Sequence, residues 1–246
     1  MTLPTQTLGR QQSEGGKYSG KIDMLVYGRS GAGKTYFTSS APGPIYLATP
    51  DPTGHRSYPF PVDGVVINHT DQLREVVTGI RQGGHGYNTL VVDGLSWLHD
   101  LLVGEMGQYF HDQMGAKDPD LMPIQARMKI SNQFRRMIRT LVNLTQLGED
   151  SAVHVIFCTL EERLKEDDEA PFQVRPLVGS QKMNEVFPAF FSIIGYIAPV
   201  GNVDEEGNPD PSRKMLFTEH KGILARDRLG VFPSMGLAPN LSNYLE

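Results

Sequence analysis

The sequence predicts an α/β fold in which a mostly parallel sheet is covered by helices on both faces. Short apolar segments typical of buried strands alternate along the chain with longer amphipathic segments typical of helices. A glycine-rich loop at 28–33 joins the first apolar segment to a helix start, and Asp93 ends a later apolar segment. In open α/β sheets such loops and strand ends meet at one edge, where ligands bind.

The first expected strand, Ile22 to Tyr27, runs directly into a loop that matches the phosphate-binding pattern G-x-x-x-x-G-K-[ST]. Its glycines let the backbone curl so that successive N–H groups point at phosphates. Lys34 brings a positive charge to the phosphates as a catalytic group, and the Thr35 hydroxyl is a ligand for Mg²⁺. The sequence therefore predicts a P-loop NTPase. The predicted nucleotide-binding residues are Gly28, Arg29, Ser30, Gly31, Ala32, Gly33, Lys34, Thr35 and Tyr36.

The next elements continue the alternation of strands and helices. The helix after the loop is expected to be short, because Ala41-Pro-Gly-Pro44 stops it. Strands are expected at Ile45 to Ala48 and at Val65 to Ile67. Asp71 is expected to cap a helix that runs to Arg81, whose apolar residues share one face.

Asn88 to Asp93 is predicted to be a strand that ends in an acid at the ligand-binding edge. In P-loop enzymes an aspartate in this place holds Mg²⁺ opposite the loop threonine, so Thr35 and Asp93 are the predicted metal ligands. Asp93 also fits as the N-cap of a helix expected from Leu95 to Phe110, and the two roles are compatible.

A loop is expected at 107–122, before a helix from Pro123 to about Leu147. One face of this helix is apolar, and its other faces carry basic residues without a single acid. Exposure of these faces to solvent would account for the basic residues, and a contact with DNA or with another subunit is the alternative. The basic residues are Arg127, Lys129, Arg135, Arg136 and Arg139.

The rest of the chain is predicted to be mainly strands. A buried strand is expected at Val153 to Thr159, and a polar excursion follows it at Glu161 to Gln181. The later segments are a strand at Phe190 to Ala198, an acidic hairpin at Asp204 to Asp210, a strand at Lys214 to Thr218 and a terminal segment at Ile223 to Phe232.

Length and composition suit one domain, expected at 21–235 between a flexible arm at 1–20 and a tail at 236–246. The single cysteine, Cys158, excludes an intrachain disulfide and favours a reducing, cytoplasmic setting. No segment reads as a membrane anchor or secretory signal. The net charge of −5 argues against a surface that binds nucleic acid throughout, but it is compatible with a local basic strip.

The order of these features resembles the compact RecA-like ATPases of phages, which include phage nucleotide-binding proteins and single-strand annealing proteins of the Sak type. The resemblance spans about residues 20–235. It is carried mainly by the P-loop with the Ala41-Pro-Gly-Pro-Ile-Tyr-Leu segment, and by Leu90-Val-Val-Asp93-Gly-Leu-Ser-Trp97. It implies an ATPase of the host cytoplasm that binds ATP and Mg²⁺ and assembles head to tail into a ring or filament. It further implies action on single-stranded DNA in recombination or annealing, with a single-strand-binding protein as a possible accessory.

The resemblance also implies roles for residues outside the P-loop. Its members place a glutamate base at the end of the second strand, where Asp51 is the nearest substitute here and a turn initiator is the alternative. Thr159, at the end of the strand expected beside the P-loop strand, is the implied γ-phosphate sensor. Arg226 and Arg228 are implied to reach the nucleotide of a neighbouring subunit, and a surface strand with a salt bridge through Asp227 is the alternative.

Two other functions stay open at this stage. Gly94 follows Asp93 where the AAA+ pattern has a glutamate that polarises water, so low turnover fits the sequence. A nucleotide-gated interaction protein, in which ATP or GTP orders loops and recruits a partner, is therefore one alternative. A small-molecule kinase is the other. The excursion at 161–181 takes the place of a DNA-binding loop in the first hypothesis, or it merely crosses the sheet edge.

Overall fold

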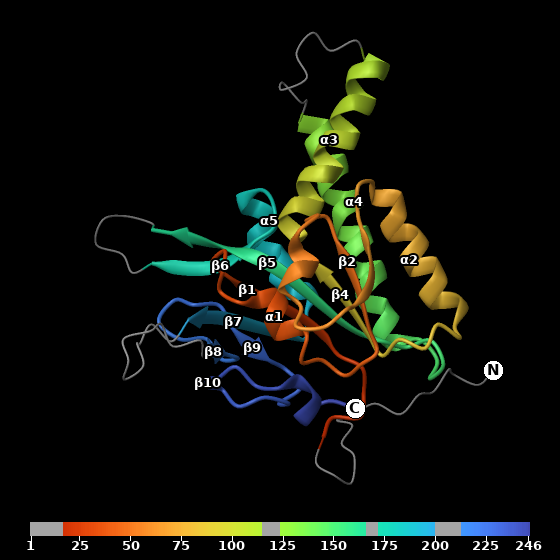
Figure 1. Cartoon of the computed structure of the whole chain (residues 1–246). Coiled ribbons are helices and arrows are strands. Elements are labelled where there is room, and N and C mark those ends of the chain that lie inside the picture. The colour runs from red at the N-terminus through yellow and green to blue at the C-terminus, as the bar shows by residue number, and fades with distance from the viewer. Residues whose placement is uncertain (1–16, 115–123, 166–171, 200–212) are drawn as a thin grey trace, which may run out of the picture.

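The computed structural model describes residues 17–114, 124–165, 172–199 and 213–246. Within these ranges ten strands form one sheet (Figure 1). The central strands β7, β1, β5, β4, β2 and β3 lie in this order and run parallel, and β8 and β10 extend the sheet antiparallel beyond β7. The strands are β1 (Asp23–Gly28), β2 (Ile45–Thr49), β3 (Asp63–Val66), β4 (Thr89–Asp93), β5 (His154–Leu164), β6 (Gln173–Leu177), β7 (Ile193–Pro199), β8 (Arg213–Leu216), β9 (Arg226–Asp227) and β10 (Met235–Leu237).

Helices cover the two faces of the sheet unequally. The longer helices α2, α3 and α4 pack on one face together with α5, while α1 lies on the other (Figure 1). None of the helices in the described ranges has the length and apolar character needed to cross a membrane. The α-helices are α1 (Lys34–Thr38), α2 (Thr70–Gln82), α3 (Leu95–Met114), α4 (Ile124–Val142) and α5 (Gln181–Val186), and the 3₁₀ helices are η1 (Gly54–Ser57), η2 (Asn143–Gln146), η3 (Phe187–Phe190) and η4 (Leu241–Asn243).

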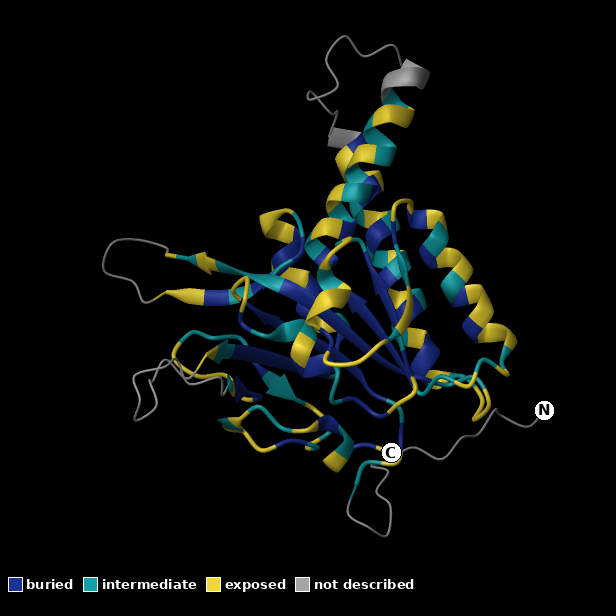
Figure 2. Ribbon diagram, viewed as in Figure 1, coloured by how far each residue is buried: buried dark blue, intermediate teal, exposed yellow. Residues whose placement is uncertain are grey.

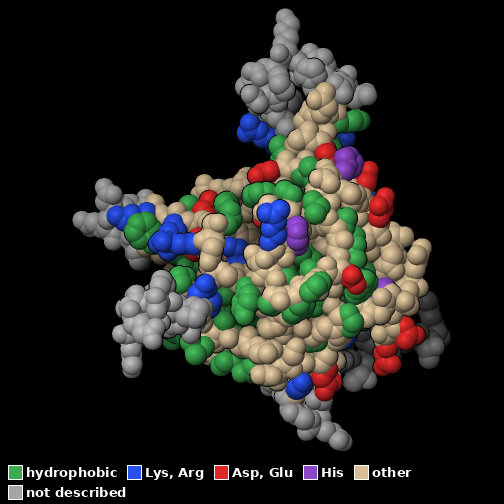
Figure 3. Space-filling view, in the orientation of Figure 1, with side chains coloured by type: hydrophobic (Ala, Val, Ile, Leu, Met, Phe, Trp, Pro, Cys, Tyr) green, Lys and Arg blue, Asp and Glu red, His purple; other side chains and the backbone are tan. Residues whose placement is uncertain are grey.

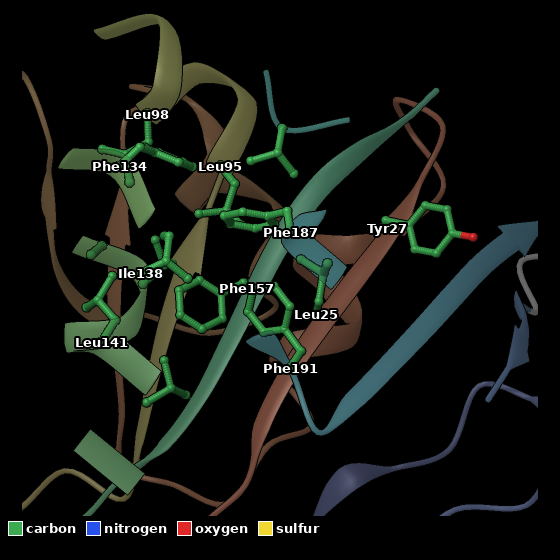
Figure 4. Packing of buried hydrophobic residues seen from close by; sticks show 14 of the residues in the cluster. Leu25, Tyr27, Leu95, Leu98, Phe134, Ile138, Leu141, Phe157, Phe187 and Phe191 are labelled. Atoms are coloured by element: carbon green, nitrogen blue, oxygen red, sulfur yellow. The ribbon is translucent and has the colours of Figure 1, made fainter. Parts of the chain in front are cut away.

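The side chains of the central strands alternate between two hydrophobic clusters, as the period of a strand requires. In β1, Leu25 and Tyr27 point to the cluster under the longer helices, whereas Met24 and Val26 point to the other cluster. β1 and β4 are buried from end to end, and most of β2, β5 and β7 is buried as well (Figure 2). Figure 4 shows aromatic rings of β5, α4 and the η3 region meeting in the first cluster, where the ring centroids of Phe157 and Phe191 are 5.1 Å apart.

The expected α/β fold with a mostly parallel sheet is confirmed. Cys158 lies on β5 and is fully buried, so it is a core residue. Three local expectations were wrong. The N-cap of α2 is His69, and Asp71 lies within the first turn of the helix. The helix α3 continues to Met114, through part of the segment expected to be a loop. The excursion after Thr159 begins as a hairpin instead, because β5 runs on to Leu164 and pairs antiparallel with β6.

The C-terminal segment expected to be a tail packs into the domain. Leu241 and Leu245 are almost fully buried in the cluster on the α1 face. Tyr18, from the expected N-terminal arm, donates its backbone N–H to the Tyr244 carbonyl at 2.8 Å. The chain on both sides of the predicted 21–235 unit therefore contributes to the fold. The rest of the arm, at 1–16, and the acidic hairpin expected at 204–210 lie outside the described residues.

Candidate nucleotide-binding site

The phosphate-binding loop spans the carboxyl end of β1, the strand near the middle of the sheet. β1 ends at Gly28 and α1 begins at Lys34. Gly33 is the N-cap of α1 with φ of 89°, a left-handed conformation that residues with a Cβ rarely adopt. The first N–H groups of α1 have no partner within the helix, so they are available to an anion held in the loop.

A cavity of about 460 Å³ opens over the loop, within the range of small-ligand sites. The loop and the neighbouring strands meet at this cavity. The residues that line the cavity include Lys34, Thr35, Asp51, Asp93, Trp97 and Thr159. Most predicted nucleotide-binding residues line this cavity as well. Ala32 does not line the cavity, because its side chain is buried in the core. Gly28 does not line it either, because it packs against the backbone of Ile197 on β7.

The Lys34 side chain lies along the loop and donates hydrogen bonds from Nζ to the carbonyl oxygens of Gly28 at 3.0 Å and Arg29 at 2.8 Å. Burial lowers the pKa of this ammonium, and nearby acids oppose that shift. The Lys34 ammonium, hydrogen-bonded to carbonyl oxygens in a partly desolvated site, is well suited to bind phosphate. Arg29 points away to Glu161, with 3.2 Å between its Nε and Oε1 of the carboxylate.

The side chains of Thr35 and Asp93 meet at the wall of the cavity. Thr35 Oγ1 donates a hydrogen bond of 2.5 Å to Asp93 Oδ2. Asp93 is 8% exposed, and burial raises the pKa of its carboxyl, while the Thr35 hydroxyl and the Lys34 charge oppose the shift. A hydroxyl and a carboxylate oxygen fit Mg²⁺, which takes few protein ligands and completes its shell with phosphate oxygens and water. The described residues contain no cluster of three or more His, Cys, Asp or Glu that would hold a metal alone.

The chain matches the protein family described as an AAA domain over residues 20–229. It belongs to this AAA domain family. The match runs from the strand before the P-loop to the end of β9, so it contains the whole cavity described above. Membership makes the chain a P-loop domain of the ATPase type. A comparison with curated proteins found no match.

The backbone of this AAA domain disfavours a glutamate directly after Asp93. Gly94 has φ of 108°, and a Cβ at this position would lie 3.3 Å from the Pro50 side chain. A side chain here would be strained by its backbone conformation and by contact with the ring of Pro50. The local structure therefore favours the glycine that the sequence has in place of the glutamate.

Asp51 lies at the wall of the cavity. Its Oδ1 accepts hydrogen bonds of 2.8 Å from both the backbone N–H and the hydroxyl of Thr53. Burial raises the pKa of this carboxyl, but these hydrogen bonds outweigh it and the net pKa is lowered. The turn that the sequence offered as an alternative is thus present, while the role of Asp51 toward a water molecule stays a prediction.

Thr159 also lines the cavity, because β5 lies directly beside β1 with Thr159 opposite Tyr27. Its hydroxyl is 2.9 Å from that of Ser96 and donates to the Leu177 carbonyl of β6. Ser96 Oγ donates to the same carbonyl at 2.7 Å. Ser96 and Trp97 also line the cavity but were not among the predicted site residues, although their place just after Asp93-Gly94 puts them at the ligand edge.

The structure places Arg226 and Arg228 away from the P-loop of the same chain. β9 pairs with Ile193 and Ile194 at the start of β7, so it lies at the amino end of the parallel strands, whereas the P-loop lies at their carboxyl end. Arg226 donates to the Pro188 and Phe191 carbonyls. Asp227 accepts from four backbone N–H groups at 229–232. A role of the two arginines in a neighbouring subunit stays a prediction.

Proposed function

We propose that this AAA domain is a Mg²⁺-dependent ATPase that acts on single-stranded DNA in recombination or annealing. The proposal that the protein acts on DNA rests on the course of β5. Its buried part ends at Thr159 in the nucleotide cavity, and the same strand then runs into the hairpin with β6. Lys and Arg side chains gather over this projecting part in Figure 3.

The described part of the hairpin combines cations with an exposed aromatic ring. Phe172 is 54% exposed, and Lys165 Nζ lies 5.8 Å from its ring centroid. Arg163 is bound at 2.7 Å to Glu161, and Arg175 is bound at 2.8 Å to Glu162. Cations track the phosphates of single-stranded DNA, and aromatic rings stack on its bases. The acidic residues at 166–169, which oppose phosphate binding, lie outside the described residues.

Hydrogen bonds link the cavity to the base of the hairpin. Thr159 and Ser96 both donate to the Leu177 carbonyl, and Leu177 pairs with Leu160 across the hairpin. A γ-phosphate that engaged the Thr159 hydroxyl would compete with these bonds and bias the position of β6. We infer that ATP and DNA binding are coupled along this route, as a RecA-like function requires.

Binding of a fluorescent single-stranded oligonucleotide tests the DNA part. The double variant Arg163→Ala with Lys165→Ala should weaken affinity by about tenfold at moderate salt and reduce the slope of affinity against salt. A matched control removes two exposed lysines elsewhere, Lys182 and Lys214, and should bind as the wild type does. Equal binding by both double variants would reject the hairpin as the DNA contact.

A nucleotide-gated interaction protein is the second candidate, and the geometry at Gly94 favours it. A glutamate there would be strained, and the Asp51 carboxylate accepts hydrogen bonds from Thr53. Slow hydrolysis that DNA does not change would support this function over the first. Assembly into a ring or filament, with or without a single-strand-binding protein, belongs to the first proposal and is tested by the mass of the protein in solution with and without ATP.

A further inference from the structure

Arg213, the first residue of β8, lies at the same edge of the sheet as the P-loop. β8 is antiparallel to β7, with Arg213 opposite Pro199 at the end of β7. β7 lies beside β1 with Tyr196 opposite Tyr27, so Pro199 extends past the end of β1 at Gly28. The sheet register thus brings an arginine from far along the chain to the level of the phosphate-binding loop.

The Arg213 side chain reaches the loop at Gly33. A Cβ built on Gly33 would lie 2.9 Å from Arg213 Nε and 3.6 Å from both Cγ and Cδ of the same side chain. Because Gly33 has no Cβ, the Arg213 side chain can pack directly against this point of the loop. Arg213 therefore occupies the side of Gly33 that a side chain would otherwise cover, next to the start of α1.

Arg213 approaches from the opposite side of β1 to the metal ligand and the γ-phosphate sensor. Asp93 and Thr159 are on β4 and β5, which follow β1 on one side in the sheet, whereas β7 and β8 follow it on the other. A triphosphate lying over the loop with its terminal phosphate toward Thr35, Asp93 and Thr159 would have its inner phosphates nearer β8. Of the described residues that line the cavity itself, Lys34 alone has a lysine or arginine side chain.

We propose that Arg213 binds the α- and β-phosphates of the nucleotide and so holds both ATP and ADP. This inference rests on the proposed nucleotide site. A guanidinium forms charge-assisted, bidentate hydrogen bonds with phosphate oxygens, which a lysine cannot reproduce. Arg213 supplies this charge within the same chain, unlike the contribution predicted for Arg226 and Arg228 in a neighbouring subunit.

Calorimetric titration with Mg-ATP and with Mg-ADP tests the assignment without relying on turnover. Arg213→Ala should raise both dissociation constants by about tenfold or more and leave their ratio unchanged. Arg213→Lys keeps the positive charge but not the planar guanidinium that binds in a bidentate way. Its dissociation constants should lie between those of the alanine variant and the wild type. The neighbouring Lys214→Ala removes an equal charge from an exposed side chain and should bind both nucleotides normally.

The alternatives give different results. Unchanged affinity of Arg213→Ala for both nucleotides overturns the proposal, and a loss confined to ATP overturns the assignment to the inner phosphates. Failure of the wild type to bind either nucleotide instead rejects the proposed function. Thermal unfolding of each variant without nucleotide is the control for folding. If Arg213→Ala does not fold, Arg213→Lys carries the test, because wild-type affinity in that variant contradicts bidentate binding.

Discussion

Thr35 Oγ1, on the helix that follows β1, lies 2.5 Å from Asp93 Oδ2 at the end of β4, although β1 and β4 are not neighbours in the sheet. β5 separates β1 from β4, and Asp93 lies opposite Cys158 of β5. The two side chains meet because both lie at the carboxyl edge, where the loop after β1 turns back over β5. The contact joins the start of α1 to the end of β4, and a divalent cation would use the same two oxygens.

We expect Asp93→Asn to remove the effect of Mg²⁺ on nucleotide binding. The amide keeps the shape of the side chain but lacks the charge that attracts the cation. Wild-type affinity for ATP should rise by about tenfold or more on addition of Mg²⁺, and the affinity of the variant should hardly change. Titrations with Mg²⁺ and with a chelator measure this. Asp100→Asn, an exposed carboxylate on α3, is the matched control, and an equal Mg²⁺ response in both variants would contradict the metal site.

Gly94→Glu should not restore fast hydrolysis, although it supplies the residue typical of AAA+ proteins. The φ of 108° and the nearby Pro50 ring should make the variant less stable by about 1–3 kcal/mol. Chemical denaturation measures this loss. Gly79→Ala on α2 is the control: a Cβ at Gly79 meets nothing within 4 Å, and the change should raise stability by about 0.5–1 kcal/mol. A stable, more active Gly94→Glu variant would show that the Gly94 backbone is not constrained.

His154 should make the domain less stable in mild acid. It is fully buried, and burial lowers its pKa to about 4, while the Glu246 backbone opposes the shift and Lys21 adds to it. The unfolded chain takes up a proton near pH 6.5, before the folded chain does, so the stability present above pH 6.5 is lost as the pH falls toward 4. The loss amounts to at most about 3 kcal/mol.

Urea denaturation at pH 7 and at pH 4.5 measures this dependence. His154→Gln should show a smaller loss of stability between the two pH values than the wild type does. The matched control is His220→Gln, at an exposed position, which should keep the wild-type dependence. Identical pH profiles for His154→Gln and wild type would contradict the role of His154.

Leu245→Ala should destabilise the domain by about 2–4 kcal/mol, because the side chain is 1% exposed and its removal leaves a cavity. Leu237→Ala is the matched control, since Leu237 is 64% exposed and should change stability little. Thermal unfolding compares the two. Equal stabilities would mean that the C-terminal segment is not part of the core.

The P-loop, the strand ending at Asp93 and the amphipathic helices could be predicted because each follows from a local pattern. The burial of Leu241 and Leu245 could not, because the short 3₁₀ helix η4 and the residues after it carry no periodic pattern. A loop was expected over 107–122, but α3 continues through Gly107 to Met114, and a glycine costs a helix only about 1 kcal/mol.

The parts of the site missed from the sequence depend on sheet register. Arg213 reaches Gly33 only because β8 pairs with the end of β7, and no spacing in the sequence encodes that pairing. The placement of Arg226 at the amino edge has the same origin, since β9 pairs with the start of β7. The resemblance implied a shared role for Arg226 and Arg228, but the sequence did not say at which edge of the sheet they lie.

The rate of Mg-ATP hydrolysis with and without single-stranded DNA tests the proposed coupling between the nucleotide site and DNA. We expect slow turnover without DNA, because no glutamate follows Asp93, and clear stimulation by DNA through the route from Thr159 to β6. Lys34→Ala should abolish both rates and serves as the background control. Turnover that is unchanged by DNA in a protein that binds Mg-ATP would contradict the coupling of the nucleotide site to DNA.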